Sequence, residues 1–177
     1  YPLLELSREL EKAEPHFNQI PRLWYRESDQ LIKSDSNQSE YLDFDHYIYP
    51  DYEDFVQQFP KEEDRELINI PINTIRAWHW GKCQFCDVNK GYKLRSRSPD
   101  CIIKEIEEIY DQYGFNTFSF VDSDTFGGKA HFEQLLNLLI YLKQRKGEDF
   151  EFWAEMIPKA EFDSALMKKM AEAGFMN

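Results

Sequence analysis

The sequence predicts an α/β fold: an incomplete parallel (βα) barrel with three βα units, preceded by an irregular connector that contains a short hairpin. Three runs of β-branched and aromatic residues each precede a segment of helical period. Such alternation gives parallel strands with helices packed outside them. Three strands cannot close a barrel and leave a sheet edge open. The chain also lacks an initiator Met, and we expect it to be part of a longer protein.

The βα part is expected at residues 67–177. Its strands are predicted at residues 67–75, 117–121 and 150–156. Its helices are predicted to start at Ser98-Pro99, Lys129 and Asp163, and to stop at Gly114, Gly147 and Gly174, which are typical capping residues. In the third helix, Leu166, Met167 and Met170 are expected to face inward. Because functional residues of such folds follow the strands, they are expected in the loops after them.

The connector is expected at residues 1–66. Residues 1–14 have the period of a helix, with Leu3, Leu6 and Leu10 on one face. Two short strands, 20–25 and 30–33, are expected to form a hairpin around Glu27-Ser28-Asp29. Residues 41–59 contain seven aromatic side chains, too many for a flexible linker. We therefore expect Trp24, Tyr25 and several of these aromatics to pack on the barrel or on parts of the protein outside this chain.

Composition limits the function classes. The net charge of −12 repels phosphate backbones, so nucleic-acid binding is not expected. No apolar run reaches the roughly 18 residues of a membrane helix, and the first residues do not resemble a signal peptide. Three cysteines, two of them close together, do not form a secreted disulfide framework. A cytoplasmic protein without a membrane partner is therefore predicted.

The chemistry-bearing segment follows the first strand. Cys83 and Cys86 stand at positions i and i+3 on a loop, so both sulfurs can point at one metal centre. Thiolates bind iron–sulfur clusters and zinc. A lone pair of cysteines at this spacing is a weak signal, and its place in an α/β repeat strengthens it.

The segment around these cysteines resembles the cluster loop of radical S-adenosylmethionine (SAM) enzymes of the cobalamin-linked and peptide-maturation type, Arg-Gly-Cys-x-Trp-Gly-x-Cys-x-Phe-Cys-Asp. The matching residues are Arg76, Trp80, Gly81, Cys83, Phe85, Cys86 and Asp87. The order of later segments, from Arg95-Ser96-Arg97-Ser98-Pro99 to Ala173-Gly174, is also similar. The resemblance implies a 4Fe-4S cluster and SAM as cofactors, and cobalamin held by a domain that would precede Tyr1.

The expected first cluster cysteine is missing. Depending on the alignment, Trp78 or His79 stands in its place. Indole cannot ligate iron, whereas imidazole can. Three readings stay open: His79 is the third ligand with Cys83 and Cys86, the cluster is absent, or a distant residue or a sequence change explains the gap. Cys101 is a poor substitute, because it lies in the first turn of a packed helix.

The resemblance also implies cofactor-binding residues. Phe85 stands where the family packs a side chain on adenine. The residues that follow the second and third strands, where the family binds SAM, are Asp122, Ser123, Asp124 and Glu155. Core packing of Phe85 and a merely solvated Glu155 are the structural alternatives. Gly127-Gly128 come later than the family's glycine-rich motif, and Ile157 replaces an arginine that often contacts the SAM carboxylate.

The predicted function is that of a radical SAM enzyme that modifies a small-molecule or peptide substrate. Two alternatives remain. A degenerate domain without a cluster would be a binding module. A zinc site could use His79, Cys83 and Cys86, with a fourth ligand from Asp87 or elsewhere.

Overall fold

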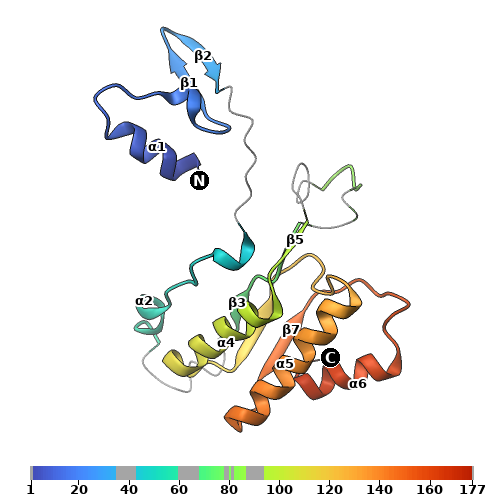
Figure 1. The fold of residues 1–177 in the computed structure, drawn as a ribbon. Coiled ribbons are helices and arrows are strands. Elements are labelled where there is room, and N and C mark those ends of the chain that lie inside the picture. Colours follow the sequence, from blue (N-terminus) through green and yellow to red (C-terminus); the bar gives the residue numbers. More distant parts are fainter. Residues whose placement is uncertain are drawn as a thin grey trace. The chain divides into compact units, whose positions relative to one another are not determined.

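The structure is a computed structural model that describes residues 2–34, 43–59, 68–77, 80, 82–86 and 94–176. The chain divides into two compact units, residues 1–42 and 43–177, which are described separately (Figure 1). The functional division that the sequence suggests, with a connector ending at residue 66, stays a prediction.

The first unit confirms the hairpin. Strands β1 (Trp24–Glu27) and β2 (Gln30–Lys33) pair antiparallel, with Glu27 opposite Gln30. Ser28 and Asp29 make the turn, and both have positive φ, 45° and 65°. Turns with positive φ at both central residues match the twist of a two-residue hairpin. The first strand was predicted at residues 20–25, so its predicted start is four residues too early and its predicted end two residues too early. Its end differs because the turn occupies only Ser28 and Asp29 and leaves Glu27 in the strand.

The helix of the first unit is shorter than its periodicity predicts. Helix α1 spans Pro2–Leu10, and a 3-10 turn η1 (Phe17–Gln19) follows. The Glu9 carboxylate accepts a hydrogen bond of 2.9 Å from the backbone N–H of His16, which folds the chain back before residue 14. Leu3 and Leu10 lie on the surface of this unit.

The second unit contains the three expected parallel strands. Their order in the sheet is β3 (Ile70–Ile72), β6 (Thr117–Phe120) and β7 (Glu151–Ala154). Both pairings are parallel, with Ile70 opposite Phe118 and Phe118 opposite Phe152. The alternation of strands and helices is therefore confirmed, whereas a closed barrel is not formed by these strands.

Helices follow the strands as the capping residues predict. Helix α4 spans Pro99–Tyr113, α5 spans Lys129–Lys146 and α6 spans Ser164–Ala173. Ser98 and Asp163 cap the first and last of these with side-chain hydrogen bonds to backbone N–H groups. All three helices end at a glycine with positive φ.

One face of the sheet carries the core. Phe118, Phe120 and Phe152 are buried and stack on one another, with ring centroids 5.6 and 5.9 Å apart. They share one apolar cluster with residues of α4, α5 and α6, so all three helices cover the same face (Figure 1). Trp153, on the other face, is partly exposed. The prediction that Met167 faces this core is wrong, because its side chain is 46% exposed.

The first predicted strand, 67–75, is interrupted. It leaves the sheet after Ile72 and continues as β4 (Ile75–Arg76), which pairs antiparallel with β5 (Arg95–Ser96). We call the β4–β5 pair the stem, because it joins the two ends of the cysteine-bearing segment. The first strand is interrupted because the Asp122 carboxylate, rather than a neighbouring strand, accepts hydrogen bonds from the backbone N–H groups of Thr74 and Ile75.

The aromatic segment of residues 43–59 packs on the rest of the second unit. It contains the 3-10 helix η2 (Phe44–His46) and a short helix α2 (Glu53–Val56). Phe44 is buried, and the ring of Tyr52 lies 6.3 Å from that of Tyr113 in α4. Packing of these aromatics is therefore confirmed. Trp24, in contrast, is 58% exposed in its own unit, and Tyr41 lies outside the described residues.

No helix in the described part of the chain combines the length and the apolar character needed to cross a membrane.

Candidate functional site

Polar side chains gather at the carboxyl edge of the parallel sheet. Asn73 and Thr74 follow β3, Asp122 and Asp124 follow β6, and Glu155 follows β7. Parallel strands bring these loops to one edge, which is the usual position of binding sites in α/β folds. The structure places the stem at this edge too, because β4 begins three residues after β3 ends.

Asp122 organises this edge from inside the protein. Its carboxylate is 4% exposed and accepts hydrogen bonds from the Asn73 side chain at 2.9 Å, from the Thr74 N–H at 2.8 Å and from the Ile75 N–H at 2.9 Å. The Thr74 hydroxyl also donates to it. Burial raises the pKa of Asp122, and the hydrogen bonds from Ile75 and Thr74 act against that rise. The carboxylate thus holds the stem in place, and direct contact with SAM stays a prediction.

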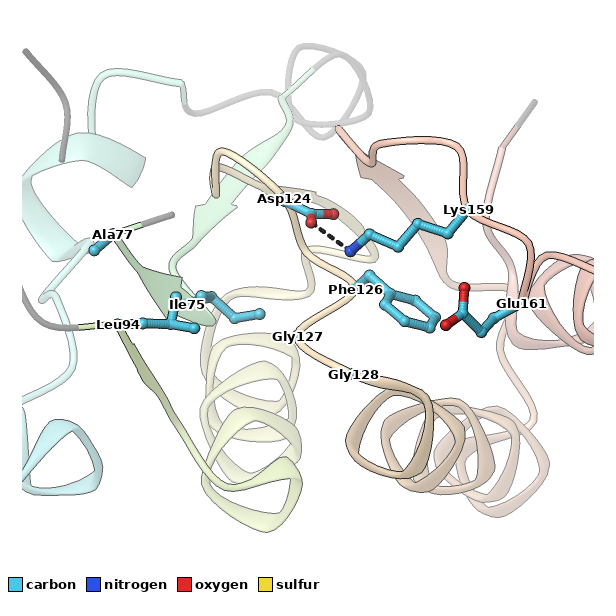
Figure 2. A pocket seen from close by; sticks show the side chains of 9 residues that line it. All are labelled: Ile75, Ala77, Leu94, Asp124, Phe126, Gly127, Gly128, Lys159 and Glu161. Carbon is cyan, nitrogen blue, oxygen red and sulfur yellow. Dashed lines mark hydrogen bonds and ion pairs between the residues drawn. The ribbon is translucent and has the colours of Figure 1, made fainter. Parts of the chain in front are cut away.

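Asp124 lies two residues further along and faces a pocket. Its carboxylate, 5% exposed, forms an ion pair of 2.6 Å with Nζ of Lys159, which is four residues beyond Glu155. The Lys159 ammonium also lies 4.6 Å from the centre of the Phe126 ring. Figure 2 shows the two side chains pointing toward each other, with Phe126 below the Lys159 side chain. A buried carboxylate next to a fixed ammonium offers one partner for a cation and one for an anion.

The pocket is small and has walls from three loops. Its volume is about 250 Å³. The lining residues are Ile75, Ala77, Leu94, Asp124, Phe126, Gly127, Gly128, Lys159 and Glu161 (Figure 2). Ile75 belongs to the stem, and Ala77 and Leu94 lie next to it, so the segment that carries the cysteines forms one wall. The other walls come from the loops after β6 and β7.

Two glycines lie in the wall of this pocket. Gly127 and Gly128 have φ of 60° and 119°, a region that side chains rarely adopt. A Cβ atom on Gly127 would lie 2.5 Å from Cδ1 of Ile75. The Ile75 side chain therefore packs directly on the Gly127 backbone, and its end would have to move to admit a larger residue there. The sequence places these glycines late for the family motif, but they lie in the pocket wall.

Cys83 and Cys86 lie on one tight turn, which we call the cysteine turn (Cys83–Cys86). The backbone N–H of Cys86 donates to the carbonyl of Cys83 at 3.3 Å, and both thiols are half-buried and free. Lys82 lies 5.0 Å from the ring of Trp80, just before the turn. The single turn fits two thiolate ligands of one metal centre. That both sulfurs face the same space stays a prediction.

A third metal ligand is not found among the described residues, which contain no group of three or more His, Cys, Asp or Glu side chains arranged to hold a metal ion. The candidate third ligand, His79, lies outside the described residues, as do Trp78, Gly81 and Asp87. Cys101 lies in the first turn of α4, where its carbonyl accepts hydrogen bonds from Tyr49 and Arg97.

Three other predicted cofactor-binding residues, Phe85, Ser123 and Glu155, are not among the residues that line the pocket. Phe85 is 93% exposed on the cysteine turn, which argues against its packing in the core. Ser123 and Glu155 are exposed at the sheet edge, and the Glu155 carbonyl accepts a hydrogen bond of 3.1 Å from the Thr125 N–H. Their roles with SAM stay predictions.

Sequence reasoning missed Lys159 and Glu161. They lie in an irregular loop between β7 and α6. Such a loop has no periodic pattern from which the direction of its side chains could be predicted. One feature of the sequence could have indicated Lys159: it is a basic residue two positions after Ile157, which replaces the arginine of the similar family.

The comparisons with known proteins bear on the fold. No family model matches the chain. An uncharacterized protein from Archaeoglobus fulgidus is 38% identical over 56 residues, which are 32% of this chain and 10% of that protein. The chain thus spans only a small part of this relative.

Two solved structures of a Kitasatospora setae protein are similar over 98% of this chain. Both are of TsrM, a radical S-adenosylmethionine methyltransferase. The structure with cobalamin and a 4Fe-4S cluster has a TM-score of 0.68 and 18% identity, and the chain covers 35% of it. The structure with tryptophan substrate and the SAM analog aza-SAM has a TM-score of 0.69 and 16% identity, and the chain covers 34% of it. At these identities the likeness establishes the fold: this chain is folded like about a third of a radical SAM methyltransferase.

Proposed function

We propose that this chain binds an iron–sulfur cluster and SAM as part of a radical SAM enzyme. The observation that carries the proposal is the shared pocket: the stem of the cysteine-bearing segment and the loop with Asp124 and Gly127 form walls of the same cavity. A cofactor bound at the cysteine turn and a ligand in this pocket would therefore be neighbours. The similarity in fold to TsrM supports this arrangement.

The pocket fits the amino-acid end of SAM. A volume of about 250 Å³ is too small for the whole molecule, which would extend out of the pocket. Lys159 would bind the carboxylate, and Asp124 would bind the ammonium group. The backbone of Gly127 and Gly128 lets the ligand approach the loop closely. Lys159 would thus supply the cation that Ile157 lacks.

The cysteine turn fits the cluster in the chemistry of its donors. Cys83 and Cys86 would each hold one iron, and we infer that His79 holds a third. When bound, the cluster supplies the electron that cleaves SAM. A neutral imidazole in place of a thiolate leaves the cluster less negative and raises its potential. It would therefore be a weaker reductant, so turnover should be slow.

Metal analysis tests the cluster. The full-length protein is reconstituted anaerobically with iron and sulfide, and the content of both is compared with that of Cys83→Ser, His79→Ala and Trp78→Cys. We expect Cys83→Ser and His79→Ala to lose most of the iron, whereas Cys101→Ser, the matched control, keeps it. Full cluster content in His79→Ala would rule out His79 as the ligand.

Ligand binding tests the pocket. We expect Lys159→Gln to weaken SAM binding by about tenfold, because a charge-assisted contact is lost. Lys168→Gln, which changes an exposed lysine of α6, is the control for net charge. Equilibrium dialysis with labelled SAM measures both. Equal SAM affinities of Lys159→Gln and Lys168→Gln would show that the amino-acid end of SAM does not bind in this pocket.

A second candidate is a degenerate binding module without a cluster. It rests on the sequence, where Trp78 or His79 stands in place of the expected first cluster cysteine. Iron in Trp78→Cys alone would support it, and zinc in the purified protein would support the zinc-site alternative instead.

Substrate and further cofactor remain predictions. Tryptophan and cobalamin are bound in structures of TsrM. For this chain, a small-molecule or peptide substrate and cobalamin held by another part of the protein are proposals from the sequence resemblance.

A further inference from the structure

The segment Phe44–Tyr49, here called the strap, lies across the stem. The guanidinium carbons of Arg76 and Arg95 each lie 5.8 Å from the centre of the Phe44 ring. These arginines are cross-strand partners in the stem, so one aromatic ring contacts both of its strands. Phe44 is 5% exposed, and Tyr47 packs edge-on against it while also lying 5.8 Å from Arg76.

The strap also holds the start of helix α4. Oδ1 of Asp45 accepts a hydrogen bond of 2.7 Å from the backbone N–H of Ser98, the residue that caps α4. The Tyr49 hydroxyl donates to the Cys101 carbonyl at 3.2 Å. The strap therefore contacts the chain on both sides of the cysteine-bearing segment: Arg76 before it, and Arg95, Ser98 and Cys101 after it.

A buried arginine completes this junction. Arg97, directly after β5, forms an ion pair with Glu105 of α4, and both side chains are buried. The same guanidinium donates to the Asn73 carbonyl at 3.1 Å and lies 5.5 Å from the Tyr49 ring. Thus strap, sheet, stem and helix meet at Arg97.

We propose that the strap positions the cysteine turn relative to the pocket. The stem has only two residue pairs, and a ladder this short is unstable without outside support. Phe44 gives that support by binding both strands, and Asp45 and Tyr49 fix the helix that follows. Because Ile75 and Leu94 are pocket-wall residues in or next to the stem, the strap also sets the position of that wall.

The consequence is a link between the polypeptide before the βα units and the cysteine turn. A displacement of the strap would loosen the stem and move Cys83 and Cys86, whereas the core around Phe118 would stay intact. Phe44 is thus a positioning residue, since it acts on the cysteines through Arg76 and Arg95.

Hydrogen exchange in the metal-free full-length protein tests this link, and its outcome does not depend on the proposed function. For Phe44→Leu, which keeps apolar bulk but removes the aromatic face, we expect amides of residues 74–77 and 94–98 to exchange about tenfold faster. Amides of residues 135–142 in α5 should be unchanged. Alkylation by iodoacetamide should become faster at Cys83 and Cys86 relative to Cys101.

The control is Tyr141→Leu, which removes another ring beneath an arginine: Arg145 lies 5.7 Å from Tyr141 on α5. It should leave the stem unchanged. If Phe44→Leu does not fold, Tyr49→Phe removes only the hydroxyl bond and should speed exchange at residues 97–101. Unchanged exchange in the stem, or an equal increase throughout the second unit and at all three cysteines, would overturn the proposal.

Discussion

Phe152 and Phe85 are the same amino acid at opposite extremes of burial. Phe152 is fully buried in the middle of the stacked rings of β6 and β7, whereas Phe85 is 93% exposed on the cysteine turn. The layer of strands and helices is held by apolar contacts among its own residues. The cysteine turn has a backbone hydrogen bond from Cys86 to Cys83 and lies beyond a stem of two residue pairs.

The difference separates the roles of the two regions. Burial of aromatic rings stabilises the layer whether or not a ligand is bound. The cysteine turn contributes little to the core, because Phe85 is exposed and the turn is connected to the layer through the two-pair stem. We therefore expect mutations in the layer to change stability, and mutations in the turn to change metal content.

The largest expected effect is a difference in stability loss between a substitution in the layer and one in the cysteine turn. Phe152→Ala should lower the free energy of unfolding by about 3–5 kcal/mol, because it leaves a cavity among stacked rings. Phe85→Ala should change it by less than about 0.5 kcal/mol. Urea unfolding of the metal-free protein measures both. Similar losses for the two variants would show that the turn is part of the core.

A smaller effect is expected at the end of α6. Gly174 has φ of 102°, and a Cβ atom there would lie 2.2 Å from the Phe150 carbonyl oxygen. Gly174→Ala should therefore cost roughly 2–4 kcal/mol. Gly147→Ala is the matched control: its φ is also positive, 68°, but nothing lies within 4 Å of the new Cβ, so about 1 kcal/mol is expected. Equal losses in thermal unfolding would mean that backbone strain alone decides.

The smallest effect depends on pH. Hydrogen bonds from the N–H groups of Leu166 and Ala165 lower the pKa of Asp163 below its ordinary 3.8. A lowered pKa means that the carboxylate stabilises the fold above that value, and that this contribution is lost as pH falls through the folded-state pKa. Asp163→Ala should thus reduce the melting temperature at neutral pH, and the deficit should shrink in acid.

Asp163→Asn is the control, because an amide oxygen still caps the helix but does not titrate. Its melting temperature relative to the native protein should vary with pH in the same direction and with a smaller deficit. A deficit of Asp163→Ala that is constant down to strongly acidic pH would contradict the assignment.

Local chemistry made the helices predictable from sequence. Ser98-Pro99 and Asp163 begin α4 and α6, and glycines end all three helices, because capping depends on neighbouring residues alone. The parallel order of β3, β6 and β7 followed from alternation, since crossover helices require it. Cys83 and Cys86 were singled out by their spacing, by their place after the first strand and by the resemblance of the surrounding residues to a cluster loop.

Only the tertiary structure decided what holds the site. Asp122 binds N–H groups 47 and 48 residues earlier in the chain, and this contact splits the predicted first strand. Lys159 reaches Asp124 across 35 residues, and Phe44 reaches both arginines of the stem. The sequence determined where helices begin and end because capping acts over a few residues. The sequence did not determine the pocket, because its walls come from separate loops that meet only after the sheet has formed.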